Sequence, residues 1–129
     1  MNGRAAHLQK MICAAMLVSN QIREGFVVMT CEKILEVFKD YLTEDDSCEV
    51  LQSSQGYLVV DWDSRKKDSD WVTSRLCQTP EQLRDVLRCR YEEYQGFKLT
   101  GGYKRELLPS ESVDIQLMGE TMAERCGEN

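Results

Sequence analysis

The chain has 129 residues, of which 42% are hydrophobic and 29% are charged, and its net charge at pH 7 is −6. This composition is typical of a folded globular protein and excludes an intrinsically disordered chain. An acidic chain repels phosphate backbones, so we do not expect it to bind nucleic acid directly. The length and the two prolines favour one main domain.

Residues 1–28 are predicted to form an N-terminal helical extension. Their apolar side chains recur at helical spacing, and the run ends at Gly25, a residue typical of helix C-termini. The apolar run 11–18 is too short to span a bilayer and lacks the cleavage site of a signal peptide, so we expect no membrane association. Self-association through this helix is one hypothesis. Its apolar stripe consists of Leu8, Met11, Ile12, Ala15 and Ile22.

The same extension has a second interpretation, at the level of the gene. Arg23, Glu24 and Gly25 can be encoded by a purine-rich run that resembles a bacterial ribosome-binding site, and Met29 follows at a short distance. The hypothesis is that translation starts at Met29 in the cell. A peptide from residues 5–22, found by mass spectrometry of the endogenous protein, would exclude it.

Residues 29–125 are predicted to form the main domain, and its first element is a helix from Thr30 to about Leu42. Thr30 is a typical N-cap residue. The side chains of Ile34, Val37, Phe38 and Tyr41 form an apolar stripe at helical spacing. An acidic turn, residues 43–47, follows this helix.

Three strands follow, predicted over 48–53, 57–63 and 71–77, with turn residues before Gly56 and a polar loop over 64–70. Because side chains alternate along a strand, Leu58, Val60 and Trp62 share one face, which we expect to be the core face. The other face then carries Tyr57, Val59, Asp61 and Asp63. Pairing Asp63 with Trp71 places Val72, Ser74 and Leu76 beside Trp62, Val60 and Leu58, and places Arg75 diagonal to Asp61.

The clearest local signal is the start of the next helix. Thr79, Pro80 and Gln82 form a capping box with proline at the first helical position. The apolar residues Leu83, Val86, Leu87, Tyr91 and Tyr94 keep helical spacing, and we expect the helix to end at Gly96.

The C-terminal part is predicted to form a hairpin and a last helix. Gly101 and Gly102 lie between two short alternating runs, which is a hairpin signal for 97–106. Ser110 is the expected cap of a helix whose apolar residues are Val113, Leu117, Met118 and Met122. Residues 126–129 are expected to be a frayed tail.

The predicted fold class is therefore α+β, with the order ααβββαββα. A small antiparallel sheet, made by the three-strand meander with the C-terminal hairpin as an optional addition, packs against helices. This order recurs in unrelated proteins, so it does not define a function.

The six cysteines contain no C-x-x-C pair and several fall inside predicted elements. This pattern favours reduced thiols that serve as small apolar side chains in a cytoplasmic protein, over disulfides in a secreted one. It also predicts no zinc site, and we expect no cofactor.

Two aspartates are the sharpest candidates for chemistry. Asp61 and Asp63 lie two apart on one strand face and could bind Mg²⁺, which suggests a metal-dependent hydrolase or nucleic-acid enzyme as the alternative function. The simpler explanation is a solvated face paired with Arg75, and we favour it. Nucleophilic catalysis would have to use His7, the only histidine, in the N-terminal extension.

A set of acidic residues could form one continuous negative surface if the first helix of the main domain ends near the sheet edge. Such a surface suits a basic protein partner, for example a nucleic-acid-binding protein. We therefore predict a small, acidic, non-enzymatic interaction or regulatory module of bacterial or phage type. The surface consists of Asp40, Glu44, Asp45, Asp46, Glu49, Asp61 and Asp63.

This prediction depends on the orientation of the sheet. If Trp62 were in solvent and Asp61 were enclosed among other ligands, a buried reactive centre would be the better interpretation.

Overall fold

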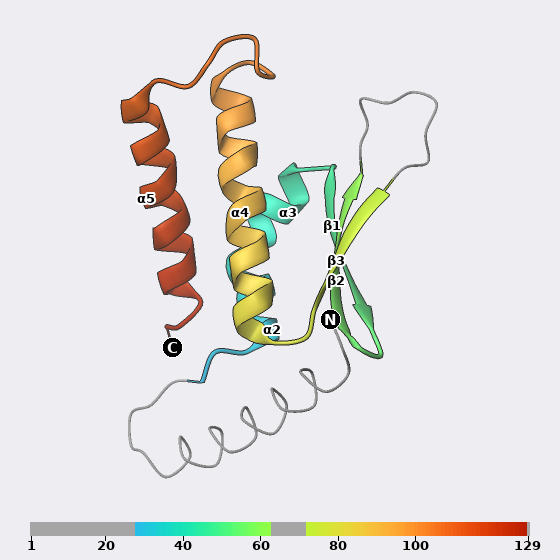
Figure 1. Cartoon of the computed structure of the whole chain (residues 1–129). Helices are drawn as coiled ribbons and strands as arrows, with labels where there is room; N and C mark the ends of the chain where they lie inside the picture. The colour runs from blue at the N-terminus through green and yellow to red at the C-terminus, as the bar shows by residue number, and fades with distance from the viewer. Residues whose placement is uncertain (1–27, 63–71, 129) are drawn as a thin grey trace.

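The computed structural model describes residues 28–62 and 72–128. Three antiparallel strands form one sheet in the order β1-β2-β3, and helices pack on one side of it, so the fold is α+β (Figure 1). The predictions for residues 1–27, Asp63, the loop 64–70 and Trp71 fall outside the described residues. In chain order the elements are α2 (Cys31–Val37), α3 (Lys39–Glu44), β1 (Cys48–Ser53), β2 (Gly56–Trp62), β3 (Val72–Cys77), α4 (Pro80–Leu99) and α5 (Pro109–Arg125).

The first predicted helix of the main domain is present as two short helices. The hydroxyl oxygen of Thr30 accepts a hydrogen bond from the backbone N–H of Lys33, which confirms Thr30 as the N-cap of α2. Phe38 has non-helical dihedral angles and separates α2 from α3. Its side chain is fully buried, and the other residues of the predicted stripe, Ile34, Val37 and Tyr41, are at most 6% exposed, so this stripe forms part of the core as expected.

The strand pairing agrees with the predicted register of β2 and β3. Leu58 lies opposite Leu76, Val60 opposite Ser74 and Trp62 opposite Val72. Strands β1 and β2 are joined by a two-residue turn between Ser53 and Gly56. Gly56 has φ +139°, and a Cβ there would collide with the carbonyl oxygen of Cys77, so this position requires glycine.

The face of the sheet that turns toward the helices is the opposite of the predicted one. Val59 is 4% exposed and belongs to the core cluster, whereas Trp62 is 45% exposed. Val60, which was predicted to face the core, is 6% exposed but does not belong to that cluster. Apolar residues occupy both faces of β2, so alternation alone does not decide which face is buried. Leu83 and Leu87 of α4 pack against the sheet in one core cluster with Cys48, Val59 and Cys77. These three sheet residues are smaller than Trp62, so they fit beneath the two leucines at the close packing of a protein core.

The outer face of the sheet is consequently apolar and is not covered by any described helix. Leu51 is 44% exposed and Leu76 is 37% exposed, in addition to Trp62. We call these three residues, with the half-buried Leu58 and the buried Val60 between them, the open sheet face. Figure 1 shows the helices on the other side of the sheet.

Helix α4 begins as predicted and ends later than predicted. The hydroxyl of Thr79 accepts from the N–H of Gln82 at 3.2 Å, and the amide oxygen of Gln82 accepts from the N–H of Thr79 at 3.2 Å, which confirms the capping box. Gly96 does not stop the helix. It is buried inside α4, where a Cβ would lie 3.3 Å from Cδ1 of Leu107, so glycine here permits close packing of the following segment.

The predicted hairpin over 97–106 is wrong, because Gly101 and Gly102 terminate α4. The N–H of Gly102 donates to the carbonyl of Phe97 at 2.8 Å, and that of Gly101 donates to the carbonyl of Lys98 at 3.2 Å. Gly101, the residue after the C-cap Thr100, has the positive φ that a Schellman helix end requires, and Gly102 also has positive φ. The ring of Tyr103 packs edge-on against Phe97, with 5.5 Å between centroids, and completes the motif.

Helix α5 runs antiparallel to α4 and differs from the prediction in both its cap and its buried face (Figure 1). It begins at Pro109, one residue before the predicted cap Ser110. Ile115 and Gly119 are its buried residues, while the predicted apolar residues Val113, Leu117 and Met118 are exposed. Cys126, which we expected in a frayed tail, is fully buried in the core.

The described helices include none that is both long enough and apolar enough to cross a membrane.

Candidate functional site

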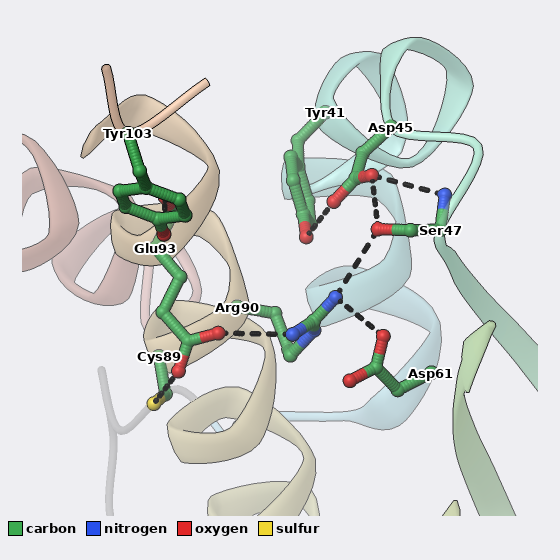
Figure 2. Close-up of polar contacts among 8 residues, drawn as sticks. All are labelled: Tyr41, Asp45, Ser47, Asp61, Cys89, Arg90, Glu93 and Tyr103. Carbon is green, nitrogen blue, oxygen red and sulfur yellow. Dashed lines mark hydrogen bonds and ion pairs between the residues drawn. The ribbon is translucent and has the colours of Figure 1, made fainter. Parts of the chain in front are cut away.

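The structure separates the predicted acidic residues into buried, paired and exposed groups. Asp45 is only 4% exposed. Its carboxylate accepts hydrogen bonds from the hydroxyl of Tyr41 at 2.7 Å and from the N–H and hydroxyl of Ser47 at 3.0 and 2.6 Å (Figure 2). Asp45 therefore fixes the connection from α3 to β1 and contributes little charge to the surface.

Asp61 belongs to the same polar network through Arg90 of α4 (Figure 2). The Nη2 atom of Arg90 donates to Oδ1 of Asp61 at 3.0 Å and to the hydroxyl of Ser47 at 3.3 Å, and Nη1 donates to Glu93 at 2.9 Å. Asp61 therefore lies on the helix side of the sheet and pairs with Arg90, while the predicted partner Arg75 is exposed on β3.

The network is a joint between the two layers of the fold. It links α3, the start of β1, β2 and α4 through one chain of hydrogen bonds. Burial and the bond to Asp45 raise the pKa of Tyr41 above its usual range, so its hydroxyl stays protonated and can donate. A part-buried hydrogen-bond network of this kind helps to fix the position of a sheet against its helices, although Nε of Arg90 is buried in it without a partner among the described residues.

The metal hypothesis receives no additional ligand from the described residues. Residues 28–62 and 72–128 contain no group of three or more histidine, cysteine, aspartate or glutamate side chains placed to hold a metal ion. Asp61 has a side chain that is 40% exposed and is neutralised by Arg90. Of the two conditions for a buried reactive centre, exposure of Trp62 is met and enclosure of Asp61 among ligands is not.

The cysteines in the described residues are all free thiols. Cys48, Cys77 and Cys126 are buried in the core, where they act as small apolar side chains. Cys89 is exposed, and its Sγ donates to Oε1 of Glu93 at 3.7 Å. Partial burial and the charge of Glu93 raise the pKa of the Cys89 thiol, which opposes formation of the nucleophilic thiolate.

Glu44 and Asp40 lie on α3 and are both exposed. The carboxylate of Glu44 accepts from Nζ of Lys98 at 2.9 Å. This bond to Lys98 lowers the pKa of Glu44. Its charge is therefore largely compensated, whereas Asp40 makes no ion pair with a described basic residue.

The last two acidic residues line a groove at the edge of β1. The groove has a volume of about 570 Å³ and lies between β1 and the helices α2 and α3. Asp46 and Glu49 are exposed on its rim. We call this the β1 groove; it is lined by Leu35, Leu42, Asp45, Asp46, Cys48, Glu49, Val50, Gln52, Tyr57 and Trp62.

The lining of the β1 groove combines apolar walls with one sign of charge. Three of its residues are acidic, and none of the described lining residues is basic. On the open sheet face, the indole N–H of Trp62 donates to Oε1 of Glu49 at 3.3 Å, which places Glu49 on that face. By contrast, the cavity of about 400 Å³ under α4 mixes both signs, with Asp61, Asp85 and Glu93 beside Arg75 and Arg90.

Sequence reasoning found the acidic residues of the groove but missed its apolar walls and missed Arg90. Leu35 and Leu42 lie seven residues apart, two helical turns, and they could have been recognised as a second apolar stripe. Arg90 had no such signal, because its partners Asp61 and Ser47 are far away in the sequence and meet it only in the folded chain.

Comparison of the chain with protein-family models, with curated proteins and with solved structures gave no match.

Proposed function

We propose that this protein is a small non-enzymatic interaction module that binds a basic protein partner at the β1 groove. The observation that carries the proposal is the lining of this groove, with apolar walls and acidic residues but no basic residue among those described. Clefts lined by one sign of charge focus the electric field and attract partners of the opposite sign. The net charge of −6 acts in the same direction.

The proposed surface is smaller than the predicted one. Asp46 and Glu49 are the exposed acidic residues of the groove, and Asp40 adds charge on α3. The carboxylates of Asp45, Asp61 and Glu44 are already bound by other side chains, so they attract a partner weakly. Few charged contacts predict a moderate affinity, and salt should weaken it because these charges are exposed.

Affinity capture from cells that express the protein tests this proposal. We expect the full chain to retain a basic protein at about 0.05 M salt and to release it at about 0.5 M, because salt screens exposed charges. The double variant Asp46→Asn/Glu49→Gln should lose the partner. The matched control Asp114→Asn/Glu120→Gln removes the same charge from exposed positions on α5 and should retain it. Failure to capture any protein at low salt, or equal capture by the two variants, would contradict the proposal.

A further inference from the structure

We propose that the partner binds by adding an extended segment to the outer edge of β1, with which no described strand pairs, and that this segment alternates apolar and basic side chains. The inference rests on the proposed function, since it describes how the same groove would hold the basic partner. It follows from three features: the unpaired backbone of β1, the alternation of its side chains, and the charge of the groove.

The backbone groups of every second residue of β1 point away from β2. The N–H of Trp62 donates to the carbonyl of Ser47 at 2.8 Å, which makes Ser47 and Trp62 a hydrogen-bonded pair. In an antiparallel ladder such pairs alternate along the strand, so Glu49 and Leu51 also bond to β2. The N–H and C=O groups of Val50 and Gln52 then face the open edge, and no described strand pairs with them.

Val50 is the first residue of β1 whose edge-facing backbone groups could pair with an added strand. The N–H of Cys48 already donates to the carbonyl of Asp45 at 3.2 Å. Val50 and Gln52 offer two donors and two acceptors at the spacing that another strand would match. Addition of a strand to an exposed edge is a recurrent mode of peptide recognition, in which the main chain supplies affinity and alternate side chains supply specificity.

The two sides of β1 select different side chains. Val50 packs against the core and faces the helices, where Leu35 and Leu42 line the groove. Glu49 faces the other way, beside Trp62. Because side chains of an added strand also alternate, those on the helix side would meet an apolar wall and those on the other side would meet a carboxylate.

The other edge of the sheet is less suitable. Arg75 is exposed on β3, opposite Val59 and therefore on the helix side of the sheet. A charged side chain that points inward at an edge discourages pairing with another strand. The cavity beside this edge also carries both signs of charge, so it does not distinguish a basic from an acidic segment.

A synthetic peptide of alternating lysine and valine, about eight residues long, is the probe for this inference. Hydrogen exchange of the full chain is followed by NMR with and without the peptide. We expect exchange of the Val50 and Gln52 amides to slow at least about tenfold, because they become hydrogen-bonded. A peptide of the same composition in two blocks, lysines then valines, should give no such protection. Equal protection by the two peptides, or none by the alternating one, would overturn the inference.

A matched pair of variants tests the same contact without relying on exchange. Gln52→Pro removes the edge-facing N–H but no bond to β2, since proline is tolerated at an edge where the N–H faces outward. Gln52→Ala keeps the N–H and removes the side chain. We expect the alternating peptide to bind the proline variant at least about tenfold more weakly than the alanine variant, which corresponds to about 1.4 kcal/mol. Equal binding would overturn strand addition.

Two further outcomes would assign the edge to a different occupant. Protection of Val50 and Gln52 without peptide, at every protein concentration, would mean that the chain itself covers the edge. Protection that rises with protein concentration would mean that two copies pair there. If capture of the cellular partner depends on Asp46 and Glu49 but is the same for the two Gln52 variants, the proposed function holds and strand addition fails.

Discussion

Arg90 shows how one side chain can join two layers of a small fold. Its guanidinium contacts the sheet through Asp61, the start of β1 through Ser47 and its own helix through Glu93. The side chain is 20% exposed, and its Nε is buried without a partner, so it is enclosed more than a surface arginine usually is. The long stem of such a residue also contributes packing.

Arg90→Ala should therefore destabilise the protein by about 2 kcal/mol, because hydrogen bonds to charged groups contribute about 1.5–3 kcal/mol and Asp61 and Ser47 lose a donor. Urea unfolding of the purified protein measures this change. Arg84→Ala is the control, since Arg84 pairs only with its exposed helix neighbour Asp85 among the described acidic residues. If the two variants were equally stable, Arg90 would not be a joint between the layers.

Glu111 gives a prediction for the pH dependence of stability. The Arg105 guanidinium donates to both its oxygens at 2.8 Å, and the N–H of Leu108 donates at 2.9 Å. These bonds lower the pKa of Glu111 from 4.5 to about 2. The unfolded carboxyl group takes up a proton first as the pH falls, so the stabilisation is complete above about pH 4.5 and is lost toward pH 2.

Glu111→Gln should thus be less stable than the wild type at pH 7, and this difference should shrink between pH 4.5 and pH 2. Urea unfolding at several pH values measures it. Glu120→Gln, at an exposed position on the same helix, is the control and should change stability little at any of these values. A difference for Glu111→Gln that stays constant down to pH 2 would show that the ion pair has no effect.

Helices α4 and α5 pack closely because two glycines lie between them. Gly96 of α4 is buried near Leu107 and Ile115, and Gly119 of α5 is buried against Glu92. A Cβ at Gly119 would lie 2.7 Å from Cγ and Cδ of Glu92, which is too close for any real contact. Glycine at this position lowers the helix propensity of α5 but allows α5 to pack closely against α4.

Gly119→Ala should be less favourable in the wild-type protein than in a Glu92→Ala background, because its Cβ must displace the Glu92 side chain and break the ion pair of Glu92 with Arg88. In the Glu92→Ala background these side-chain atoms are absent, and the substitution should stabilise by up to about 1 kcal/mol through helix propensity. Denaturant unfolding of the four proteins in this cycle gives the coupling free energy. An equal effect of Gly119→Ala in both backgrounds would exclude contact with Glu92.

Local signals allowed some elements to be predicted from the sequence, and longer-range packing explains where prediction failed. Thr79, Pro80 and Gln82 define the start of α4 within four residues, so its cap was predicted correctly. Gly96 has the sequence features of a helix end, but its role depends on α5, which packs there. The same limit applies to the sheet face: nothing near Trp62 in sequence shows that α4 covers Val59 instead.

The candidate site was predicted in part for the same reason. Acidic residues at the end of α3 and the start of β1 were expected to lie on one surface, and Asp46 and Glu49 do line one groove. Asp45 and Asp61 do not contribute free charge to that surface, because Asp45 accepts a hydrogen bond from Tyr41 and Asp61 accepts one from Arg90. Only the folded chain brings these groups together.

At the scale of the whole molecule, the fold has two layers, with helices on one side of a three-stranded sheet and the open sheet face on the other (Figure 1). The β1 groove and the open sheet face meet at Trp62, which belongs to both. A strand added to β1 would widen the open sheet face by one strand. The partner's own residues would then decide how polar that enlarged face becomes.

The exposed Leu51, Trp62 and Leu76 have a practical consequence for handling the protein. Mutual repulsion at a net charge of −6 keeps copies apart in dilute buffer, and concentrated salt removes that repulsion while it strengthens apolar adhesion. Salt should therefore have opposite effects on the two surfaces. It should release a basic partner from the β1 groove, and it should promote association of neighbouring molecules through the open sheet face. A purification step at high salt, used to remove contaminants, should therefore yield aggregated protein that has lost its bound partner.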